Sequence, residues 1–214
     1  MKILFTGFEP FGGEELNPSY EALKLLPDTI AGAEVVRLQI STAFQRGAEE
    51  MLAAVEQHQP AVVICVGQAG GRFAVTPEFV AINYSDARIP DNVGFQPAGE
   101  AVVSGGENAY FTALPVKRIT QRMREEGIPA SVSYTAGTYV CNDVFYRLLH
   151  HIHTRQSELV GGFIHVPYAH EQAAKLGGNM PSLSLETIAR ALQIAGETAI
   201  TFRTDLTEAG GETH

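Results

Sequence analysis

The sequence predicts an α/β sandwich, in which helices cover both faces of a largely parallel sheet. Short apolar runs alternate along the chain with amphipathic segments of helical length, which is the order of strands joined by helical crossovers. Residues 61 to 67, "AVVICVG", are apolar throughout, which is typical of a strand buried on both faces. The 214 residues contain no repeat, linker or break in composition, so we expect a single domain over residues 1 to 214.

Local signals set the limits of these elements in the N-terminal half. Gly7 ends the first strand, and Asn17 and Pro18 supply the cap and the first position of a helix. Pro60 ends a second helix, whose apolar residues recur on one face from Phe44 onward. We therefore expect strands at residues 2 to 6, 33 to 40, 61 to 67 and 78 to 84, with helices after the first and second strands.

The C-terminal half continues the alternation. Residues 84 to 106 are rich in glycine, proline, asparagine and aspartate, which predicts a long loop. The polar residues 201 to 214 are expected to form a flexible tail. Helices are predicted from residue 116 to Gly127, at 144 to 155 and at 184 to 199, and strands at 130 to 135 and 159 to 166.

The composition argues against several classes of protein. The formal net charge is −9 and no basic run occurs, so nucleic acid and anionic membrane are not expected as partners. No apolar stretch approaches the ~20 residues that span a bilayer, and Glu9 and Pro10 come too early for the apolar core of a signal peptide. Two cysteines without a CxxC pair predict neither a disulfide framework nor a cysteine-rich metal site. We expect a cytoplasmic protein without a cofactor.

The unusual residues of the chain cluster near the ends of predicted strands. In open α/β sheets, ligands bind beyond the carboxyl ends of the parallel strands. The loops that follow "KILFT", "AVVICV", "SVSYT" and "FIHV" are therefore expected to lie near one another.

Cys141 stands where a strand gives way to a helix. Unpaired N–H groups and the helix dipole favour a thiolate there, so the sulfur is a candidate nucleophile. The alternative is a packing role, because free cysteines are among the most buried residues. Cys65 lies inside the apolar run of residues 61 to 67, and we assign it to the core.

His165 ends an apolar strand, and its ordinary pKa suits a general base. The alternative is a histidine that only hydrogen-bonds a nearby loop. A carboxylate would orient such a base, and spacing does not select among five candidates. Glu78 differs from the others because it opens a largely apolar strand, where an unpaired carboxylate would be costly. The five candidates are Glu9, Glu78, Asp86, Asp91 and Asp143.

Three further patterns give weaker signals. "GQAGGR", residues 67 to 72, lacks the GxGxxG spacing and the GKS/T ending of nucleotide loops, so we expect a backbone wall beside a small ligand. The histidines at positions 150, 151 and 153 have no carboxylates at ligand spacing and predict a solvated helix face rather than a metal site. Phe8 and Phe11 form either an apolar slot or a minor hydrophobic cluster.

Five motifs, which occur in the order of the family, give the chain a resemblance to pyroglutamyl peptidase type I. These enzymes, also called pyrrolidone-carboxylate peptidases, are cysteine peptidases. The motifs are "GFEPFGG" with "NPS" behind it, "GQAGGR", "PEFVAINYSDARIPDN", "AGTYVCND" and "GFIHVPY". Together they cover the chain to about residue 200. The resemblance implies a three-layer α/β/α sandwich with a mixed, mostly parallel sheet, and it favours catalysis over packing for Cys141.

The resemblance also implies residue roles. Cys141 is the expected nucleophile, His165 the acid and base, and Glu78 the carboxylate that orients it, with no metal. The substrates would be peptides with N-terminal pyroglutamate, and the assembly a homotetramer. The residues expected to hold the pyroglutamyl ring are Phe8, Phe11, Thr42, Gln68, Ile89, Tyr139 and Val140, with backbone groups near Gln68 reading the lactam.

Three positions depart from the family pattern, and two alternative functions stay open. Phe79 stands where arginine is usual, Tyr139 where phenylalanine is usual, and Asp143 where histidine is common. Asp143 places a negative charge two residues from the sulfur. A homologue altered in this way would bind pyroglutamyl peptides without cleaving them. A nucleoside phosphorylase-like enzyme would share the architecture and would not need Cys141.

Overall fold

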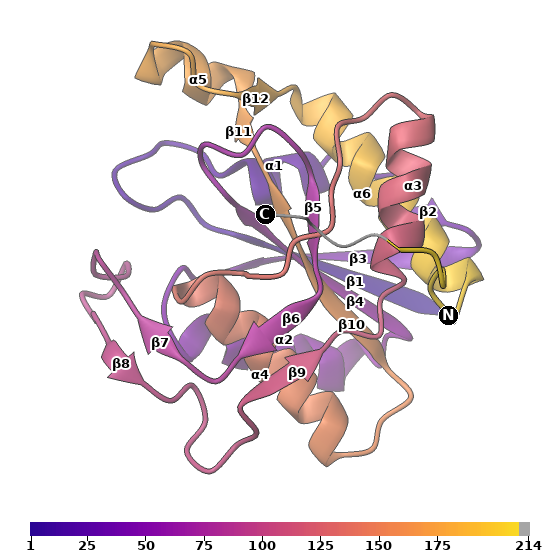
Figure 1. Cartoon of the computed structure of the whole chain (residues 1–214), viewed down its shortest axis with the longest axis horizontal. Coiled ribbons are helices and arrows are strands. Elements are labelled where there is room, and N and C mark those ends of the chain that lie inside the picture. Colours follow the sequence, from indigo (N-terminus) through magenta and orange to yellow (C-terminus); the bar gives the residue numbers. More distant parts are fainter. Residues whose placement is uncertain (210–214) are drawn as a thin grey trace.

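A computed structural model describes residues 1 to 209 and contains a six-stranded central sheet in the order β2-β3-β1-β4-β10-β5 (Figure 1). The inner strands β3, β1, β4 and β10 are parallel, whereas β2 and β5 run antiparallel at the two edges. The predicted mixed, mostly parallel sheet is confirmed. Its strands are β1 (Lys2–Phe8), β2 (Thr29–Ile30), β3 (Ala33–Ile40), β4 (Val62–Gln68), β5 (Thr76–Glu78) and β10 (Val160–Val166).

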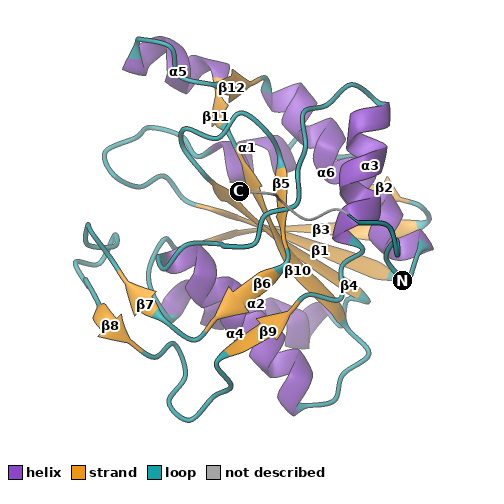
Figure 2. Ribbon diagram, viewed as in Figure 1, coloured by secondary structure: helices purple, strands orange, loops and turns teal. Residues whose placement is uncertain are grey.

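Helices cover both faces of this sheet, and the strands lie between them in Figure 2. One layer consists of α1 (Pro18–Leu23), α3 (Val116–Glu125) and α6 (Leu185–Thr201). The other consists of α2 (Arg46–His58) and α4 (Val140–Thr154). A short helix, α5 (His170–Leu176), follows the sheet near its carboxyl edge. Three small pairs complete the fold: β6 (Val80–Ile82) with β9 (Ala109–Phe111), β7 (Ser85–Asp86) with β8 (Ala98–Glu100), and β11 (Tyr168–Ala169) with β12 (Ser182–Leu183).

The alternation of side chains along a strand explains why β4 is apolar at every position from Val62 to Val66. Val62, Ile64 and Val66 pack into the core on the side of α1, α3 and α6. Val63 and Cys65 face the core on the side of α2 and α4. A strand that is covered by helices on both faces therefore carries apolar side chains on both sides. Cys65 is fully buried, as expected from its place in this run.

The predicted strand at residues 78 to 84 is divided in the structure. Glu78 closes β5 in the central sheet, while Val80 opens β6, which pairs with β9. The predicted strand at 130 to 135 runs beside β5 as isolated bridges only. Pro77 supplies no N–H group to a ladder at this edge, which limits the pairing.

The start of the C-terminal tail packs on α3. Asp205 accepts hydrogen bonds from the backbone N–H groups of Lys117 and Arg118, at 3.0 and 2.9 Å. The Arg118 guanidinium lies 4.3 Å from the centre of the Phe202 ring. The segment from residue 202 is thus held by α3, and residues 210 to 214 of the expected flexible tail lie outside the described residues. Within residues 1 to 209, no helix combines the length and the apolar character that a membrane crossing requires.

Asp205 acts as the cap of α3, although it lies far from this helix in the sequence. Pro115, the residue at the N-cap position, gives no side-chain hydrogen bond. Replacement of Asp205 by alanine is expected to lower the free energy of unfolding by about 1 kcal/mol, the usual effect of losing a cap. Urea unfolding measures this. Glu208→Ala is the control, because Glu208 contacts Lys117 only through its backbone carbonyl. Equal losses in the two variants would contradict the capping role.

Candidate active site

A pocket of about 170 Å³ opens at the carboxyl ends of the parallel strands. Phe8 ends β1 and Gln68 ends β4, while His165 stands one residue before the end of β10. The predicted gathering of strand-end loops is therefore found in the structure. The residues that line the pocket are Phe8, Phe11, Asn17, Thr42, Gln68, Ala136, Tyr139, Val140, Cys141 and His165.

His165 and Glu78 form a buried pair behind this pocket. The Nδ1 atom of His165 lies 2.7 Å from Oε1 of Glu78, and the two residues are 4% and 0% exposed. The antiparallel pairing of β5 with β10 sets Glu78 opposite Phe163, two residues before His165. Of the five acids that spacing left open, Glu78 is the one whose carboxylate contacts His165.

The Glu78 carboxylate is held as an anion despite its burial. Burial alone would raise its pKa, but hydrogen bonds and charges outweigh that effect and lower the pKa below its ordinary value of 4.5. The groups responsible are His165, the Ser133 hydroxyl and the guanidinium of Arg72. A carboxylate bound to Nδ1 of a histidine fixes the ring orientation and leaves Nε2 free for another partner.

Arg72 is the residue of this network that sequence reasoning did not select. Its Nη1 atom lies 2.7 Å from Glu78 Oε1 and 2.6 Å from Thr76 Oγ1, and Nη2 donates to the Thr135 carbonyl at 3.1 Å. The motif "GQAGGR" contained the only available signal, an arginine directly after a Gly-rich turn. Asn17 and Ala136 also line the pocket without having been assigned to it.

Cys141 occupies the second position of α4, after Tyr139 at the N-cap. A Cβ atom added at Gly67 would lie 2.9 Å from Cys141 Sγ, so the absence of a side chain on β4 makes room for the sulfur. Gly67 pairs with His165 across the parallel strands. Paired residues project from the same face of a sheet, which brings the sulfur to the face that carries the imidazole.

Burial and, to a smaller extent, the Glu78 carboxylate raise the pKa of the Cys141 thiol to about 12, although Arg72 acts to lower it. The thiol is therefore protonated at neutral pH before any proton transfer. A nucleophilic sulfur in this position needs a base close to it, and His165 is the imidazole on the same face.

Aromatic rings form the walls of the pocket. Tyr139 packs against Phe11 and Phe44, with ring centres 6.3 and 5.3 Å apart, and its hydroxyl donates to the Pro90 carbonyl at 3.0 Å. Thr42 is fixed by its hydroxyl, which donates to the Glu9 carbonyl. All eight of the residues predicted at the site other than Glu78 and Ile89 line the pocket.

Two predicted residues lie outside that lining. Glu78 stands behind His165, in the position described above. Ile89 is 48% exposed and belongs to the segment that follows β7.

Asp143 stabilises a strained turn through its carboxylate. Its carboxylate accepts hydrogen bonds from the Gln45 backbone N–H at 2.9 Å and from Arg147 Nε at 3.0 Å. Gln45 has φ 62° and ψ −52°, and Arg46 N–H donates to the Phe44 carbonyl at 2.6 Å, which together define a classic γ-turn. The Asp143 carboxylate is thus paired next to Phe44, whose ring packs against Tyr139 of the pocket.

Comparison with known proteins places the chain in a family. The family model described as pyroglutamyl peptidase matches residues 1 to 202. The chain belongs to the pyroglutamyl peptidase family. The pyrrolidone-carboxylate peptidase of Bacillus amyloliquefaciens is 51% identical over 214 residues, which is 100% of this chain and 99% of the relative. That of Bacillus subtilis is 51% identical over 218 residues, with 100% and 99% covered.

Solved structures agree with this assignment. The crystal structure of pyroglutamyl peptidase I from Bacillus amyloliquefaciens matches with a TM-score of 0.93 and 50% identity, over 97% of this chain and 99% of that one. The pyrrolidone carboxyl peptidase from Thermococcus litoralis matches with a TM-score of 0.92 and 38% identity, over 97% and 99% of the two chains. The resemblance inferred from the five motifs is confirmed.

The buried Asp143 network predicts a large effect on stability. Asp143→Ala would leave the Gln45 N–H and Arg147 Nε without their acceptor, and we expect the free energy of unfolding to fall by about 2 kcal/mol. Asp28→Ala is the matched control, because Asp28 also pairs with an arginine, at 3.0 Å, but its side chain is 96% exposed. The control is expected to lose less than about 0.5 kcal/mol in the same urea titration. Equal losses would contradict this account of Asp143.

Proposed function

We propose that this pyroglutamyl peptidase hydrolyses the amide bond after an N-terminal pyroglutamyl residue, with Cys141 as nucleophile, His165 as acid and base, and Glu78 as the orienting carboxylate. One observation carries the proposal: the buried His165–Glu78 contact of 2.7 Å stands at a pocket that also contains the sulfur of Cys141. The family assignment supports the same reaction.

The first half of the reaction forms a thioester. The Cys141 thiol gives its proton to His165, and Glu78 stabilises the imidazolium that results. The thiolate attacks the pyroglutamyl carbonyl carbon, and N–H groups at the start of α4 stabilise the oxyanion of the tetrahedral intermediate. The intermediate collapses with cleavage of the C–N bond, and His165 protonates the departing amine of the shortened peptide.

The second half releases pyroglutamate. His165, neutral again, removes a proton from a water molecule that attacks the thioester carbonyl. The C–S bond breaks, and the sulfur regains its proton from the imidazolium. No residue leaves this cycle in a changed protonation state, so each turnover consumes one water molecule and one amide bond.

The lining of the pocket suits a neutral substrate end. Its ten residues include aromatic and small apolar side chains and contain no aspartate or glutamate. A free α-ammonium group would lack a carboxylate partner there, and burying it unpaired would be costly. A lactam has no charge, and its N–H and C=O groups can bond to backbone groups near Gln68. Proline lacks the ring carbonyl and is expected to be a very poor substrate.

The three departures from the family pattern are accommodated outside the pocket or at its edge. The Phe79 ring packs against Phe111, with centres 5.1 Å apart, and it is not a lining residue. The Tyr139 hydroxyl is bonded to the Pro90 carbonyl, and Asp143 is paired with Arg147. These contacts support a working peptidase over a homologue that only binds. Cationic side chains would stabilise the phosphate of a phosphorylase, and the lining contains neither lysine nor arginine.

The proposal also covers the cellular location, the substrates, the partners and the assembly of the enzyme. Its substrates are peptides with N-terminal pyroglutamate in the cytoplasm, and nucleic acid and membranes are not partners. The assembly is a homotetramer, as the family resemblance implies. Light scattering coupled to gel filtration measures the mass of the assembly, and a monomer would contradict this last element alone.

Replacement of Cys141 tests the chemistry directly. With a fluorogenic pyroglutamyl amide, Cys141→Ser is expected to lose at least about 10³-fold in kcat/KM while it folds normally. Cys65→Ser is the control and should retain turnover but lose about 1 to 3 kcal/mol of stability, because it buries a hydroxyl in an apolar core. Wild-type protein that is folded, reduced and inactive on this amide would refute the proposed function.

A further inference from the structure

We propose that Arg72 is a positioning residue of the active site, which holds the Glu78 carboxylate against His165 and fixes the segment that leads to Cys141. The inference rests on the proposed function and deepens it. Among the contacts of the described residues, Arg72 touches neither the pocket nor the sulfur, so it acts through Glu78, through the backbone and through its charge.

A glycine turn aims the Arg72 side chain at β5. Arg72 N–H donates to the Ala69 carbonyl at 3.2 Å, which closes a four-residue turn after β4. Gly71, at the third position, has φ 88°, a conformation that a side chain would strain. The glycines of "GQAGGR" thus reverse the chain, and the residue that emerges from the turn is the arginine.

The guanidinium bonds to three acceptors on two segments of the chain. Nη1 bonds to Thr76 and Glu78, which are two residues apart and so lie on the same face of β5. Nη2 bonds to the carbonyl of Thr135, six residues before Cys141. A planar group with several donors can hold all three acceptors at once, whereas the ammonium of lysine is a compact charge on a flexible stem.

One carboxylate oxygen receives both partners. Oε1 of Glu78 lies 2.7 Å from Arg72 Nη1 and 2.7 Å from His165 Nδ1. Glu78 is fully buried, while the Arg72 side chain is 30% exposed. The arginine therefore brings a positive charge from the surface to a carboxylate that water does not reach. Without it, the imidazolium would be the one remaining cation near Glu78 among the described contacts.

The sign of the effect on pH dependence follows from Coulomb's law. The titratable groups around Arg72 are Glu78 on β5, His165 on β10 and Cys141 on α4, with Cys65 on β4 close to Cys141. A fixed positive charge lowers the pKa of every neighbouring group, because it disfavours each added proton. Removal of Arg72 should raise the pKa of Glu78 and of Cys141, so that both limbs of the profile of kcat/KM against pH move to higher pH.

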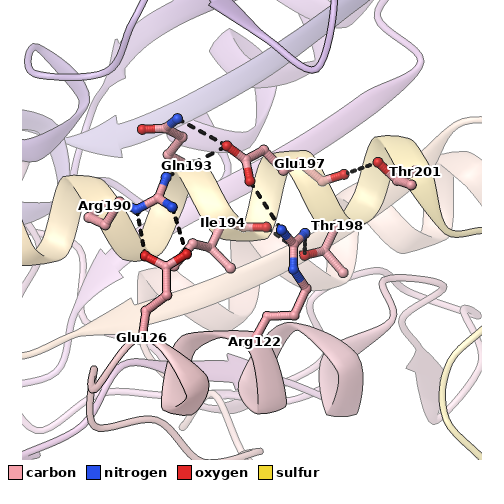
Figure 3. Close-up of polar contacts among 8 residues, drawn as sticks. All are labelled: Arg122, Glu126, Arg190, Gln193, Ile194, Glu197, Thr198 and Thr201. Carbon is pink, nitrogen blue, oxygen red and sulfur yellow. Dashed lines mark hydrogen bonds and ion pairs between the residues drawn. The ribbon is translucent and has the colours of Figure 1, made fainter.

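A second arginine supplies a matched control. Arg122 on α3 bonds to a threonine hydroxyl and a carboxylate on α6, Thr198 Oγ1 at 2.8 Å and Glu197 Oε2 at 3.2 Å (Figure 3). Its side chain is 33% exposed, close to the 30% of Arg72. Arg122 thus makes the same kinds of contact, between two helices of the layer opposite to α4.

The experiment compares Arg72→Gln, Arg72→Lys and Arg122→Gln with the wild type on the fluorogenic pyroglutamyl amide. In Arg72→Gln, we expect kcat to fall and both limbs to move up by about one pH unit. Arg72→Lys keeps the charge, so its limbs should stay in place while kcat falls about tenfold because the planar fork is lost. Arg122→Gln should match the wild type in kcat, KM and both limbs.

A measurement without turnover separates this inference from the proposed function. The rate at which iodoacetamide alkylates Cys141, located by mass spectrometry, rises with pH as the thiol ionises. In Arg72→Gln this rise should shift to higher pH, whether or not the amide is cleaved. Unshifted limbs and an unshifted alkylation curve would reduce Arg72 to a structural role and overturn the inference. Full activity in Arg72→Lys would overturn the positioning by the planar group, even if Arg72→Gln failed to fold.

Discussion

The carboxylate of Glu78 is fully buried at an edge of the central sheet, and a charge in such a place is stable only when donors surround it. Two side chains of the site supply such donors. His165 approaches from the neighbouring strand, and Arg72 returns from a glycine turn to reach the same oxygen. The donors that keep Glu78 ionised also fix the imidazole ring. The same contacts therefore stabilise the buried carboxylate and orient His165.

The sulfur reaches this arrangement because backbone and helix approach each other closely. Gly67 leaves the space that Cys141 Sγ occupies, and α4 begins at the residue before Cys141. Burial raises the pKa of the Cys141 thiol, so a nucleophilic role requires a base. In the proposed mechanism, that base is His165, and the Glu78 carboxylate stabilises the imidazolium. The surrounding walls are aromatic and uncharged, which fits the proposed lactam. The proposed nucleophile, the proposed base and the pocket thus depend on the same strand ends.

The sequence predicted most of the fold, because burial on both sides leaves a direct trace in strands such as residues 61 to 67. It also placed Cys141 and His165 near strand ends from local pattern alone. Glu78 could be chosen only through the family resemblance, since its contact with His165 joins positions 87 residues apart. Arg72 and the Asp143 turn were not found for the same reason. Hydrogen bonds between distant segments leave no periodic pattern in the sequence, and the single strand predicted at residues 78 to 84 includes only the last residue of the antiparallel edge strand β5.

The central claim is that Glu78 and His165 together make Cys141 a nucleophile for the pyroglutamyl group. A pyroglutamyl chloromethyl ketone tests it, since the thiolate would displace chloride and form a stable thioether. Peptide mapping should find one equivalent of label on Cys141, formed more slowly in Glu78→Gln and more slowly in the presence of 2-pyrrolidone. Label on Cys65, or a rate at Cys141 that is the same in Glu78→Gln, would contradict the account.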